Sequence, residues 1–371
     1  MLRSNVRIRA AVDAEAGNRE AKIKLRRMQN PSGLILDDPG VRSFQYHCFS
    51  AAMIYEIYQE TKDPFFLESF SRAVSFIRHF ILPNGDTLYV GRGQQQSFGY
   101  ASLIYILSAL YALTGDRFVL GDLVTVARYV TSYARLDGSL PLVLGGGEEP
   151  LPHPNNPHQD PKYLGWYAYN NYFDYLPFAG LFLRKSAELL MSVKVGAPGC
   201  INQEPYRDPD FMKVISGQTI FVISRAGGYW ANDLPVPYVY SGGRARTPCY
   251  GGEQFGESIY SLKGIPLPVR SSGCSLRWKA LSFFVRDMMV VISPLGVLFR
   301  RYEFAEDRIA IRNCLLSPFR LKDHYLFLID NGINLRSEYP LIPAGQEHSA
   351  SGRLRVFESE HIGDIILEFS E

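Results

Sequence analysis

The sequence lacks several features that define whole classes of proteins. Its five cysteines are scattered and never spaced as CxxC, so neither a disulfide framework nor a zinc knuckle is expected. Lysine and arginine exceed aspartate and glutamate by only two, and the one dense run of charge, residues 22–27, stands alone. A nucleic-acid-binding protein needs a clustered basic surface. We therefore expect no nucleic-acid partner.

Targeting and membrane segments are also missing. No uninterrupted run approaches 18 apolar residues, so we expect no membrane insertion. The first residues, MLRSNVRIRAAVDAEAG, lack the apolar stretch and cleavage site of a secretory signal. Two localisations stay open: the protein acts inside the cell, or the chain is a mature or trimmed form. The sequence gives no indication of oligomeric state.

The first half of the chain has the apolar spacing of helices. The 371 residues exceed the usual domain of about 100–200, which predicts two domains. Between residues 41 and 191, apolar residues recur every three or four positions. The breakers TKDP, LPNGDT, LTGD and LDGS interrupt this pattern at short intervals, as in antiparallel helical hairpins. We predict a helical domain over residues 1–197.

The second half has a different period. Segments such as TIFVIS, MMVVIS and RIAIRNCLL are short, β-branched and aromatic, and turn residues separate them. We predict an antiparallel β-sandwich over residues 198–371. Two long irregular stretches, residues 144–163 and 236–258, interrupt the two halves. Connections of this length are usually functional or mobile, so we expect them to line a site.

Three helical stretches carry candidate site residues. The first, SFQYHCFS, places Tyr46 and His47 side by side early in a helix. The second, PNGDTLYVGRGQQQSFGY, brings Arg92, Gln95, Gln96 and Tyr100 to a helix start. There the arginine and the helix N-terminus would supply positive potential to an anionic ligand. Packing and single buried hydrogen bonds remain the alternative for the first stretch, and a solvated helix start for the second.

The third stretch, YLGWYAYNNYFDYLPF, is rich in aromatic residues with polar tips. Flat rings that stack on sugar faces, beside amides that bond hydroxyls, would explain this composition. Core packing with peripheral hydroxyls is the alternative. The residues concerned are Trp166, Tyr169, Asn170, Asn171 and Tyr172.

Together these stretches resemble the polysaccharide lyases built from an (α/α) toroid and an antiparallel β-sandwich, such as the heparinase II/III-like and the alginate or hyaluronan lyase groups. The resemblance implies a fold of helical hairpins, an incomplete (α/α) toroid, followed by the sandwich. It also implies an acidic, uronic-acid-containing polysaccharide as substrate and β-elimination as reaction. The motifs that carry it are short, and we count only six or seven helices.

The resemblance assigns roles to these residues. Arg92, with Gln95 or Gln96 and Asn171, would neutralise the uronate carboxylate. His47, with Tyr46 or Tyr172, would transfer protons, and a tyrosine with an unperturbed pKa of about 10 would need a positive neighbour such as Arg92. Further candidates for substrate binding come from the two irregular stretches: His153, Asn156, His158, Arg244, Arg246, Tyr250 and Glu253.

Two other functions are open, and no cofactor is expected. The histidines of the second half, His324, His348 and His361, lack metal-ligand spacing, so we expect no metal there. A glycoside hydrolase on the same scaffold would use paired carboxylates. A glycan-binding protein without catalysis would keep only the aromatic residues. Candidate carboxylates for the hydrolase are Asp86, Glu148, Glu149, Asp174 and Glu253.

Overall fold

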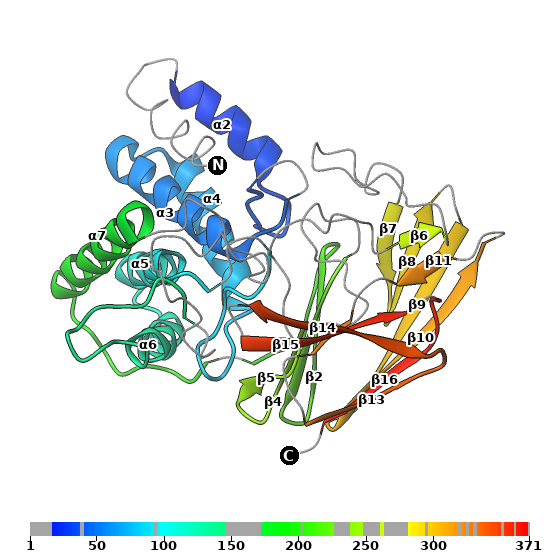
Figure 1. Ribbon diagram of the computed structural model, residues 1–371. Coiled ribbons are helices and arrows are strands. Elements are labelled where there is room, and N and C mark those ends of the chain that lie inside the picture. The colour runs from blue at the N-terminus through cyan, green and yellow to red at the C-terminus, as the bar shows by residue number, and fades with distance from the viewer. Residues whose placement is uncertain are drawn as a thin grey trace. The chain divides into compact units, whose positions relative to one another are not determined.

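The computed structural model describes residues 17–37, 41–91, 95–144, 172–201, 203–225, 238–247, 260–262, 281–293, 296–317, 321–323, 326–328, 332–349, 352–359 and 361–369. The chain forms two compact units, whose main division falls between Gln203 and Glu204. Every described helix belongs to the first unit and every described strand to the second, as Figure 1 shows. The predicted order, helical hairpins and then antiparallel sheets, is confirmed.

Six helices make up the described part of the first unit. Aspartates of the predicted breakers cap two of them: the carboxylate of Asp63 accepts from the N–H of Phe65 at 3.0 Å, and that of Asp116 from Phe118 at 2.9 Å. Gly115, with a φ of +66°, ends the helix before Asp116. The helices are α2 (Gly17–Met28), α3 (Phe44–Thr61), α4 (Pro64–Arg78), α5 (Ser97–Thr114), α6 (Arg117–Thr131) and α7 (Tyr172–Met191).

Helices α3 and α5 run parallel to each other. Near their starts, the rings of Tyr46 and Phe98 lie 6.3 Å apart, and two to three turns later those of Tyr55 and Tyr105 lie 5.8 Å apart. Helix α4 runs the opposite way along α3, because it returns from the short turn at residues 62–63. Helix α6 likewise returns from α5 through residues 115–116. The hairpins therefore bring the starts of α3 and α5 to the same end of the unit.

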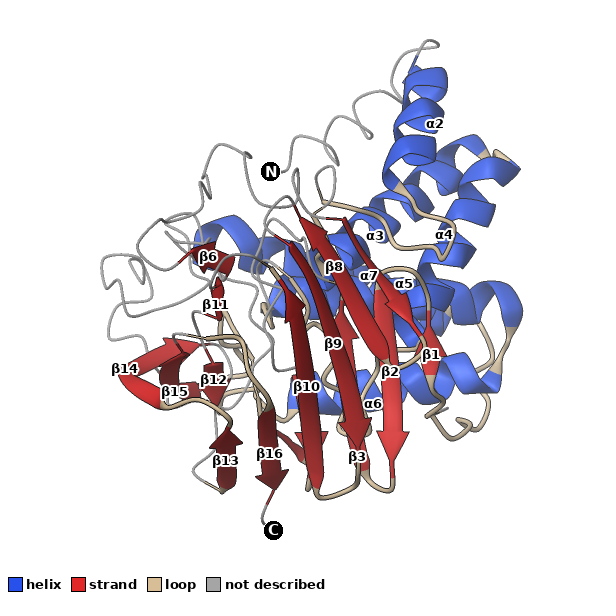
Figure 2. Ribbon diagram, turned by 90° about the vertical axis from the view of Figure 1, so that its right-hand side faces the viewer, coloured by secondary structure: helices blue, strands red, loops and turns tan. Residues whose placement is uncertain are grey.

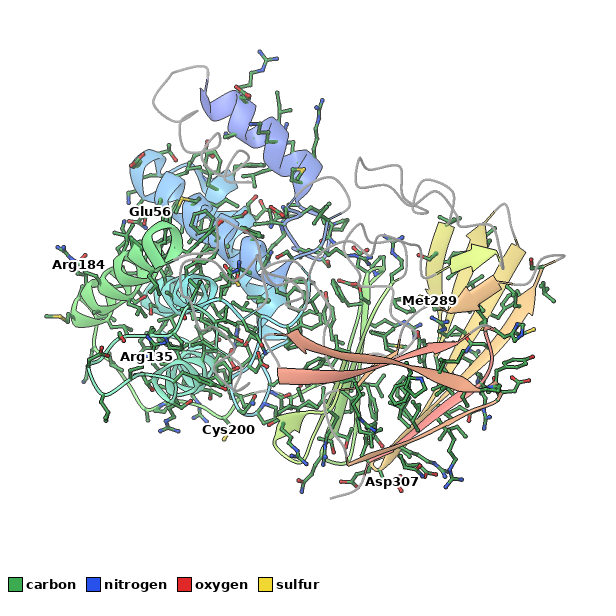
Figure 3. All side chains as sticks on the ribbon, viewed as in Figure 1. Glu56, Arg135, Arg184, Cys200, Met289 and Asp307 are labelled. Atoms are coloured by element: carbon green, nitrogen blue, oxygen red, sulfur yellow. The ribbon has the colours of Figure 1, made fainter. Side chains whose placement is uncertain are left out.

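Helix α7 follows the same direction as α3 and α5. Its Tyr175 stacks on Phe98 at 4.5 Å, and its Phe182 stacks on Tyr105 at 5.5 Å. Farther along, Lys185 of α7 forms an ion pair of 2.6 Å with Glu56 of α3, which Figure 3 labels. The hydroxyl of Tyr105 also donates to Glu56. These contacts hold the three parallel helices together over their length.

Helix α5 is apolar on nearly all sides. By length and composition it could cross a membrane, with a mean hydropathy of 1.4, although serine, glycine and tyrosine interrupt the apolar residues. Within the structure, 83% of it is buried among the other helices. A helix that is hydrophobic all round is expected at the centre of a helical core. The position of α5 between α3, α6 and α7 accounts for its composition.

The described residues of the second unit form a five-stranded and a six-stranded sheet, and all of the described strand pairings are antiparallel. The five-stranded sheet has the order β1-β2-β3-β4-β5, and the six-stranded sheet β13-β16-β10-β9-β8-β7. Figure 2 shows β13, β16, β10, β9 and β8 of the six-stranded sheet side by side. Two smaller sheets are β11-β6 and β12-β15-β14. The strands are Tyr206–Arg207 (β1), Phe211–Ser216 (β2), Thr219–Ser224 (β3), Tyr238–Ser241 (β4), Arg244–Ala245 (β5), Tyr260–Leu262 (β6), Leu281–Val285 (β7), Met288–Ser293 (β8), Gly296–Phe304 (β9), Arg308–Leu316 (β10), Leu321–Asp323 (β11), Leu326–Leu328 (β12), Ile333–Ser337 (β13), Leu341–Ser349 (β14), Gly352–Ser359 (β15) and Ile365–Phe369 (β16).

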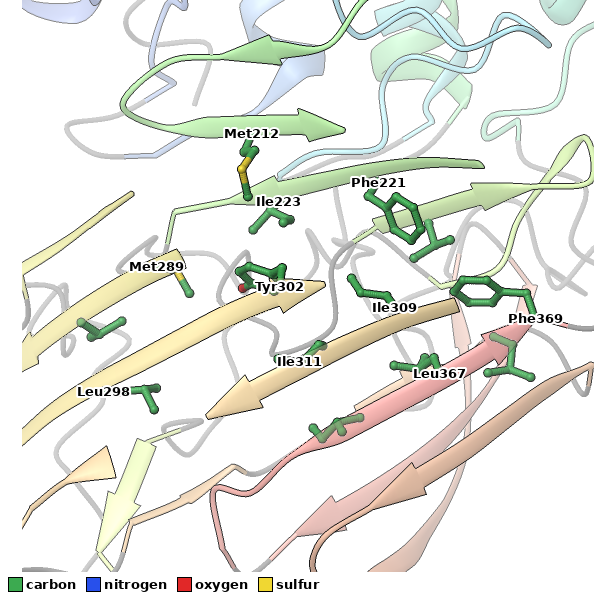
Figure 4. Packing of buried hydrophobic residues seen from close by; sticks show 14 residues of the cluster. Met212, Phe221, Ile223, Met289, Leu298, Tyr302, Ile309, Ile311, Leu367 and Phe369 are labelled. Carbon is green, nitrogen blue, oxygen red and sulfur yellow. The ribbon is translucent and has the colours of Figure 1, made fainter. Parts of the chain in front are cut away.

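One hydrophobic core lies between the two larger sheets. Met212, Phe221 and Ile223 come from the five-stranded sheet, whereas Tyr302 and Ile311 come from the six-stranded one (Figure 4). Their alternation along each strand is the pattern of a half-buried sheet. Burial of each such side chain stabilises the fold by about 1.5–3 kcal/mol. The two sheets therefore form the predicted sandwich.

Candidate functional site

The starts of α3 and α5 meet beside the GRGQQQ segment. The side-chain amide of Gln45, in the first turn of α3, donates to the amide oxygen of Gln96, the N-cap of α5, at 3.2 Å. The N–H of Phe44 donates to the carbonyl of Val90 at 3.0 Å. Each helix start carries roughly half a positive charge. The N–H groups of Tyr46 and Ser97 also have acceptors inside the fold, the hydroxyl of Ser43 and the carbonyl of Leu142. Two such ends therefore lie next to the residues that precede α5.

The backbone on both sides of residues 92–94 is fixed. Gly91 has a φ of +84°, and a side chain there would lie 2.0 Å from the carbonyl oxygen of Arg42 and 2.6 Å from the Cα of Ser43. Gln95 has a φ of +54°, which is uncommon for a residue other than glycine. Its N–H donates to Leu88, and its carbonyl accepts from Leu144 at 2.7 Å. Gly91 therefore lies against the start of α3, and Gln95 is held just before the start of α5.

A buried hydrogen-bond network holds this turn. The carboxylate of Asp86 accepts from the hydroxyl of Tyr100 at 2.5 Å and from the side-chain amide of Gln95 at 3.0 Å. The same hydroxyl accepts from the N–H groups of Thr87 and Leu88, both at 3.3 Å. Burial first, and then the charge of Asp86 and the hydrogen bond to it, raise the pKa of Tyr100 well above its ordinary value. Tyr100 is therefore a neutral structural donor at physiological pH.

Two of the three glutamines have structural tasks. Gln95 and Gln96 are each 2% exposed, and their amides bond Asp86 and Gln45 within the fold. The sequence interpretation placed these amides, together with Arg92, against a ligand. In the structure both amides face buried partners instead. Arg92 and Gln94 themselves lie outside the described residues.

The buried side chain of His47 links two backbone segments of the helical unit. The N–H of Ile35 donates to its Nδ1 at 2.9 Å, so the proton must be on Nε2, which lies 3.0 Å from the carbonyl oxygen of Ala73. The ring is fully buried, and burial lowers its pKa to about 4, although the bond to Ala73 opposes the shift. Because both nitrogens are occupied and no solvent reaches them, this arrangement argues against His47 as the proton-transfer residue.

The two tyrosines proposed for proton transfer belong to the first turns of α3 and α7, which start at the same end of the unit. Tyr46 is 3% exposed and lies one turn into α3, with its ring against Phe98. Tyr172 is the first residue of α7. Tyr175, one turn later, stacks on Phe98, which is two residues beyond Gln96. The helix starts that carry Tyr46, Gln96 and Tyr172 are thus brought together.

The other predicted site residues fall into two groups. In the second unit, Arg244 is exposed, and Arg246 is 3% exposed with its Nε donating to the carbonyl of Ser241 at 3.2 Å. The remaining ones lie outside the described residues: His153, Asn156, His158, Trp166, Tyr169, Asn170, Asn171, Tyr250 and Glu253.

The carboxylates proposed for a hydrolase include one with a defined environment. Asp86 is 4% exposed and bonded to Tyr100 and Gln95, which is the setting of a structural carboxylate. Glu148, Glu149, Glu253 and the side chain of Asp174 are outside the described residues. Within the described ranges, no group of three or more His, Cys, Asp or Glu residues could hold a metal ion.

Sequence reasoning missed the residues that assemble the site. Gln45 was not singled out, because a glutamine in the first turn of an apolar helix gives no sign of its partner. Gly99 was also missed: a side chain there would lie 2.7 Å from the Cγ of Gln45 and 2.9 Å from Leu88. A glycine one turn after a polar helix start was the available signal, since glycine in a helix needs a reason.

Comparison with known proteins gives distant structural likenesses only. No family model matches the sequence, and a search of curated proteins finds no significant match. The structure of a heparan sulfate lyase HepC mutant from Pedobacter heparinus is similar over 99% of this chain, at 9% identity and a TM-score of 0.45. This chain spans 59% of the length of that lyase chain. A GH127 β-L-arabinofuranosidase, Ara127N-Se, from Geobacillus stearothermophilus T6 is similar over 98% of this chain and 70% of its own, at 10% identity and a TM-score of 0.25. Neither likeness is close enough to assign residues.

Proposed function

We propose that the protein is a polysaccharide lyase that cleaves a uronic-acid-containing polysaccharide by β-elimination. The observation that carries the proposal is the meeting of α3, α5 and α7 at one end of the helical unit, where the described residues Gly91 and Gln95 flank Arg92 in the chain. The lyase-like motifs of the sequence lie in or next to the starts of these three helices. The order of helical hairpins and antiparallel sandwich supports the same reading.

Carboxylate neutralisation is the first task of this reaction. The proton on the sugar carbon next to the carboxylate becomes acidic only when the charge of the carboxylate is offset. Three helix N-termini supply fixed positive potential, and a guanidinium at position 92 adds a full charge with paired donors.

Proton transfer falls to residues other than His47. Tyr172 is our candidate for the base, since it begins α7 at the end where α5, which follows Arg92 in the chain, also starts. A nearby positive charge lowers the pKa of a tyrosine toward the working range. His153 and His158, which precede α7 in the sequence, are the alternative bases. Tyr46 is 3% exposed, so the burial that argues against His47 also argues against Tyr46, and His153 or His158 would protonate the leaving oxygen.

Sugar binding is assigned to the residues that lead into α7. Trp166, Tyr169, Asn170 and Asn171 precede Tyr172 directly in the chain. Aromatic rings with amides beside them suit sugar rings, which have an apolar face and a rim of hydroxyls. A carboxylate-bearing polymer would then be held by its rings on one side and by positive charge on the other.

The product of the reaction tests the proposal. Elimination leaves an unsaturated uronate with a characteristic ultraviolet absorbance, and hydrolysis does not. We expect this absorbance to rise on one member of a panel of uronic-acid polymers and bacterial exopolysaccharides. The variants Arg92→Gln and Tyr172→Phe should lose at least about a hundredfold in kcat/KM, a loss typical of charge-stabilising and acid–base residues.

A matched control separates the site from general charge loss. Arg117→Gln removes a cation from the first position of α6, where the guanidinium lies over Phe118, and should keep full activity. New reducing ends on a glycan without the absorbance would replace the lyase by the hydrolase. Binding of an acidic glycan without any cleavage would leave a glycan-binding protein.

A further inference from the structure

Helix α2 presents a positively charged face to solvent. Its 12 residues, GNREAKIKLRRM, contain five cations and one carboxylate. Ala21 and Leu25 are buried, and the exposed side chains lie on the opposite side, because residues three or four positions apart share one side of a helix. The exposed residues on that side, which we name the basic face, are Arg19, Ile23, Arg26 and Arg27.

The ion pairs of α2 use its two lysines. The Nζ of Lys22 lies 2.5 Å from Oδ2 of Asp63, and the Nζ of Lys24 lies 3.8 Å from Oε1 of Glu20. Across the described ranges, no carboxylate pairs with any of the three arginines of the basic face. These arginines therefore present three positive charges over about 12 Å of helix.

Helix stability alone does not account for this arrangement. Cations in the last turn interact favourably with the helix dipole, which explains Arg26 and Arg27. Arg19 stands in the first turn, where the same dipole opposes a positive charge. Lys22 and Arg26 are four residues apart, and like charges at this spacing destabilise a helix. An anionic ligand on the basic face would offset both costs.

The basic face has the side chains that an acidic sugar chain needs. The guanidinium of Arg26 lies over the ring of Phe65, 5.5 Å from the ring centroid. An arginine that stacks by its face keeps the N–H groups at its edge for paired hydrogen bonds to a carboxylate. Ile23, which is 39% exposed, adds an apolar contact beside the arginine stems.

The basic face lies away from the proposed site. Phe65 follows the turn that ends α3, so Arg26 is near the end of α3 and not near its start. The 18 residues of α3 span about 27 Å. Figure 1 shows α2 at the upper edge of the helical unit. A ligand that contacts both places must therefore be a long chain.

We propose that the basic face binds the acidic polysaccharide at a distance from the site, as a second contact for a chain that also occupies the starts of α3, α5 and α7. The proposal rests on the proposed function, from which it takes the class of ligand. A second contact raises the effective concentration of the polymer at the site. Long chains therefore gain affinity from the basic face, and short oligosaccharides do not.

The composition of the chain and of α2 favours a glycan over two other polyanionic partners. A nucleic-acid-binding surface is a large basic patch, whereas this chain has an excess of only two cations. A helix that lies in a membrane surface has a broad apolar face, whereas Ile23 is the one apolar residue of the basic face.

Binding of long and short chains tests the basic face. The triple variant Arg19→Gln, Arg26→Gln, Arg27→Gln is compared with its parent in the Tyr172→Phe background, so that the polymers stay intact. The ligands are polymeric alginate, hyaluronan and polygalacturonate, and the tetrasaccharide of each. We expect the triple variant to bind a polymer about tenfold more weakly at low salt and its tetrasaccharide equally well.

A second triple variant controls for the loss of charge. Arg117→Gln, Arg128→Gln, Arg184→Gln removes three exposed arginines from α6 and α7 and should leave polymer binding unchanged. Replacement of the basic-face arginines by lysine keeps the charge and should weaken polymer binding less than replacement by glutamine. Circular dichroism of each variant checks that it is folded.

The outcomes separate this proposal from the proposed function. A parent that binds none of the polymers, or a triple variant that binds them as tightly as the parent, would overturn the basic face. An equal loss in the control variant, or for the tetrasaccharide, would also overturn it. Duplex DNA or phosphatidylserine vesicles bound as tightly as the polymer would overturn the glycan as ligand. A tenfold loss of polymer binding in a protein that cleaves no polymer would support the basic face and reject only the lyase.

Discussion

The ring of Phe98 stacks on the ring of Tyr175, with centroids 4.5 Å apart and an interplanar angle of 28°. This contact joins the first turn of α5 to the first turn of α7. Phe98 also touches the rings of Tyr46 and Phe49 of α3. One aromatic side chain therefore lies where the three parallel helices begin, directly below the proposed site.

Removal of the Phe98 ring should destabilise both the proposed site and the helical unit. Phe98→Ala should lower the free energy of unfolding of the helical unit by about 3–5 kcal/mol, the usual cost of deleting a buried aromatic ring. Phe98→Leu should cost clearly less, of the order of 1–2 kcal/mol, because it fills part of the space. Denaturant unfolding followed by circular dichroism measures both. Equal losses for the two variants would contradict the central position of the ring.

The close approach of α3 and α5 predicts opposite effects for two glycines. Gly99→Ala would place a Cβ 2.7 Å from the Cγ of Gln45, so the helices must separate and stability should fall by about 1–3 kcal/mol. Gly180→Ala, in α7, meets nothing within 4 Å and should raise stability by about 0.5–1 kcal/mol through helix propensity. Thermal unfolding of the two variants side by side measures both changes. A stabilising Gly99→Ala would show that the approach is not tight.

The Tyr100 hydroxyl should contribute more to the free energy of unfolding than an ordinary surface hydroxyl does. Tyr100→Phe leaves the buried carboxylate of Asp86 with one donor fewer and the N–H groups of Thr87 and Leu88 without their acceptor. The expected loss is about 1–3 kcal/mol. Tyr58→Phe, at a partly exposed phenol of α3, should stay within about 0.5 kcal/mol of the wild type.

The hydrogen bond between Tyr100 and Asp86 makes the free energy of unfolding depend on pH in the alkaline range. The pKa of Tyr100 is raised in the folded protein, so the stability it contributes is complete below its ordinary pKa of 10.0 and is lost as the pH rises further. The unfolding free energy of the wild type should therefore fall more steeply above pH 10 than that of Tyr100→Phe. Identical slopes would mean that Tyr100 does not remain protonated in the folded state.

The lowered pKa of the buried His47 ring predicts that the protein loses stability as the pH falls. Its pKa falls from 6.5 in the unfolded chain to about 4 in the folded one, so the folded state binds fewer protons between these values. Stability is complete above pH 6.5 and declines as the pH falls toward 4, by about 3 kcal/mol in total. His47→Gln should flatten this decline, although it is less stable at pH 7. Ser69→Ala, at a nearby buried serine of α4, should keep the wild-type slope.

Several parts of this structure were predictable from the sequence for identifiable reasons. Asp63 and Asp116 cap helices after the predicted breakers, because a short acceptor side chain before an apolar repeat fixes a helix start locally. The order of strands was not predictable: β16 lies between β13 and β10, a pairing between distant segments that depends on the complete core. Local patterns specify elements, whereas such neighbours are selected by packing.

The site shows the same limit at the level of single residues. Composition pointed to the starts of three helices, and the structure brings these three starts together. It did not reveal that Gln95 and Gln96 face inward, because an amide suits a ligand and a buried carboxylate equally well. It also did not reveal that both nitrogens of His47 are used by the backbone. Partners that lie far away in the sequence decide these roles.

Hydrogen–deuterium exchange with a bound acidic oligosaccharide tests whether the starts of α3, α5 and α7 bind an acidic glycan with the help of Arg92. The Arg92→Gln and Tyr172→Phe variants should be compared with the wild type in the presence of oligosaccharides from alginate and hyaluronan, beside a neutral oligosaccharide of equal length. We expect an acidic ligand to slow exchange in residues 41–47, 95–100 and 172–176 of the wild type and of Tyr172→Phe. In Arg92→Gln the same ligand should slow exchange in these residues much less. Slower exchange confined to α2 or to the strands, with none at these three helix starts, would contradict it.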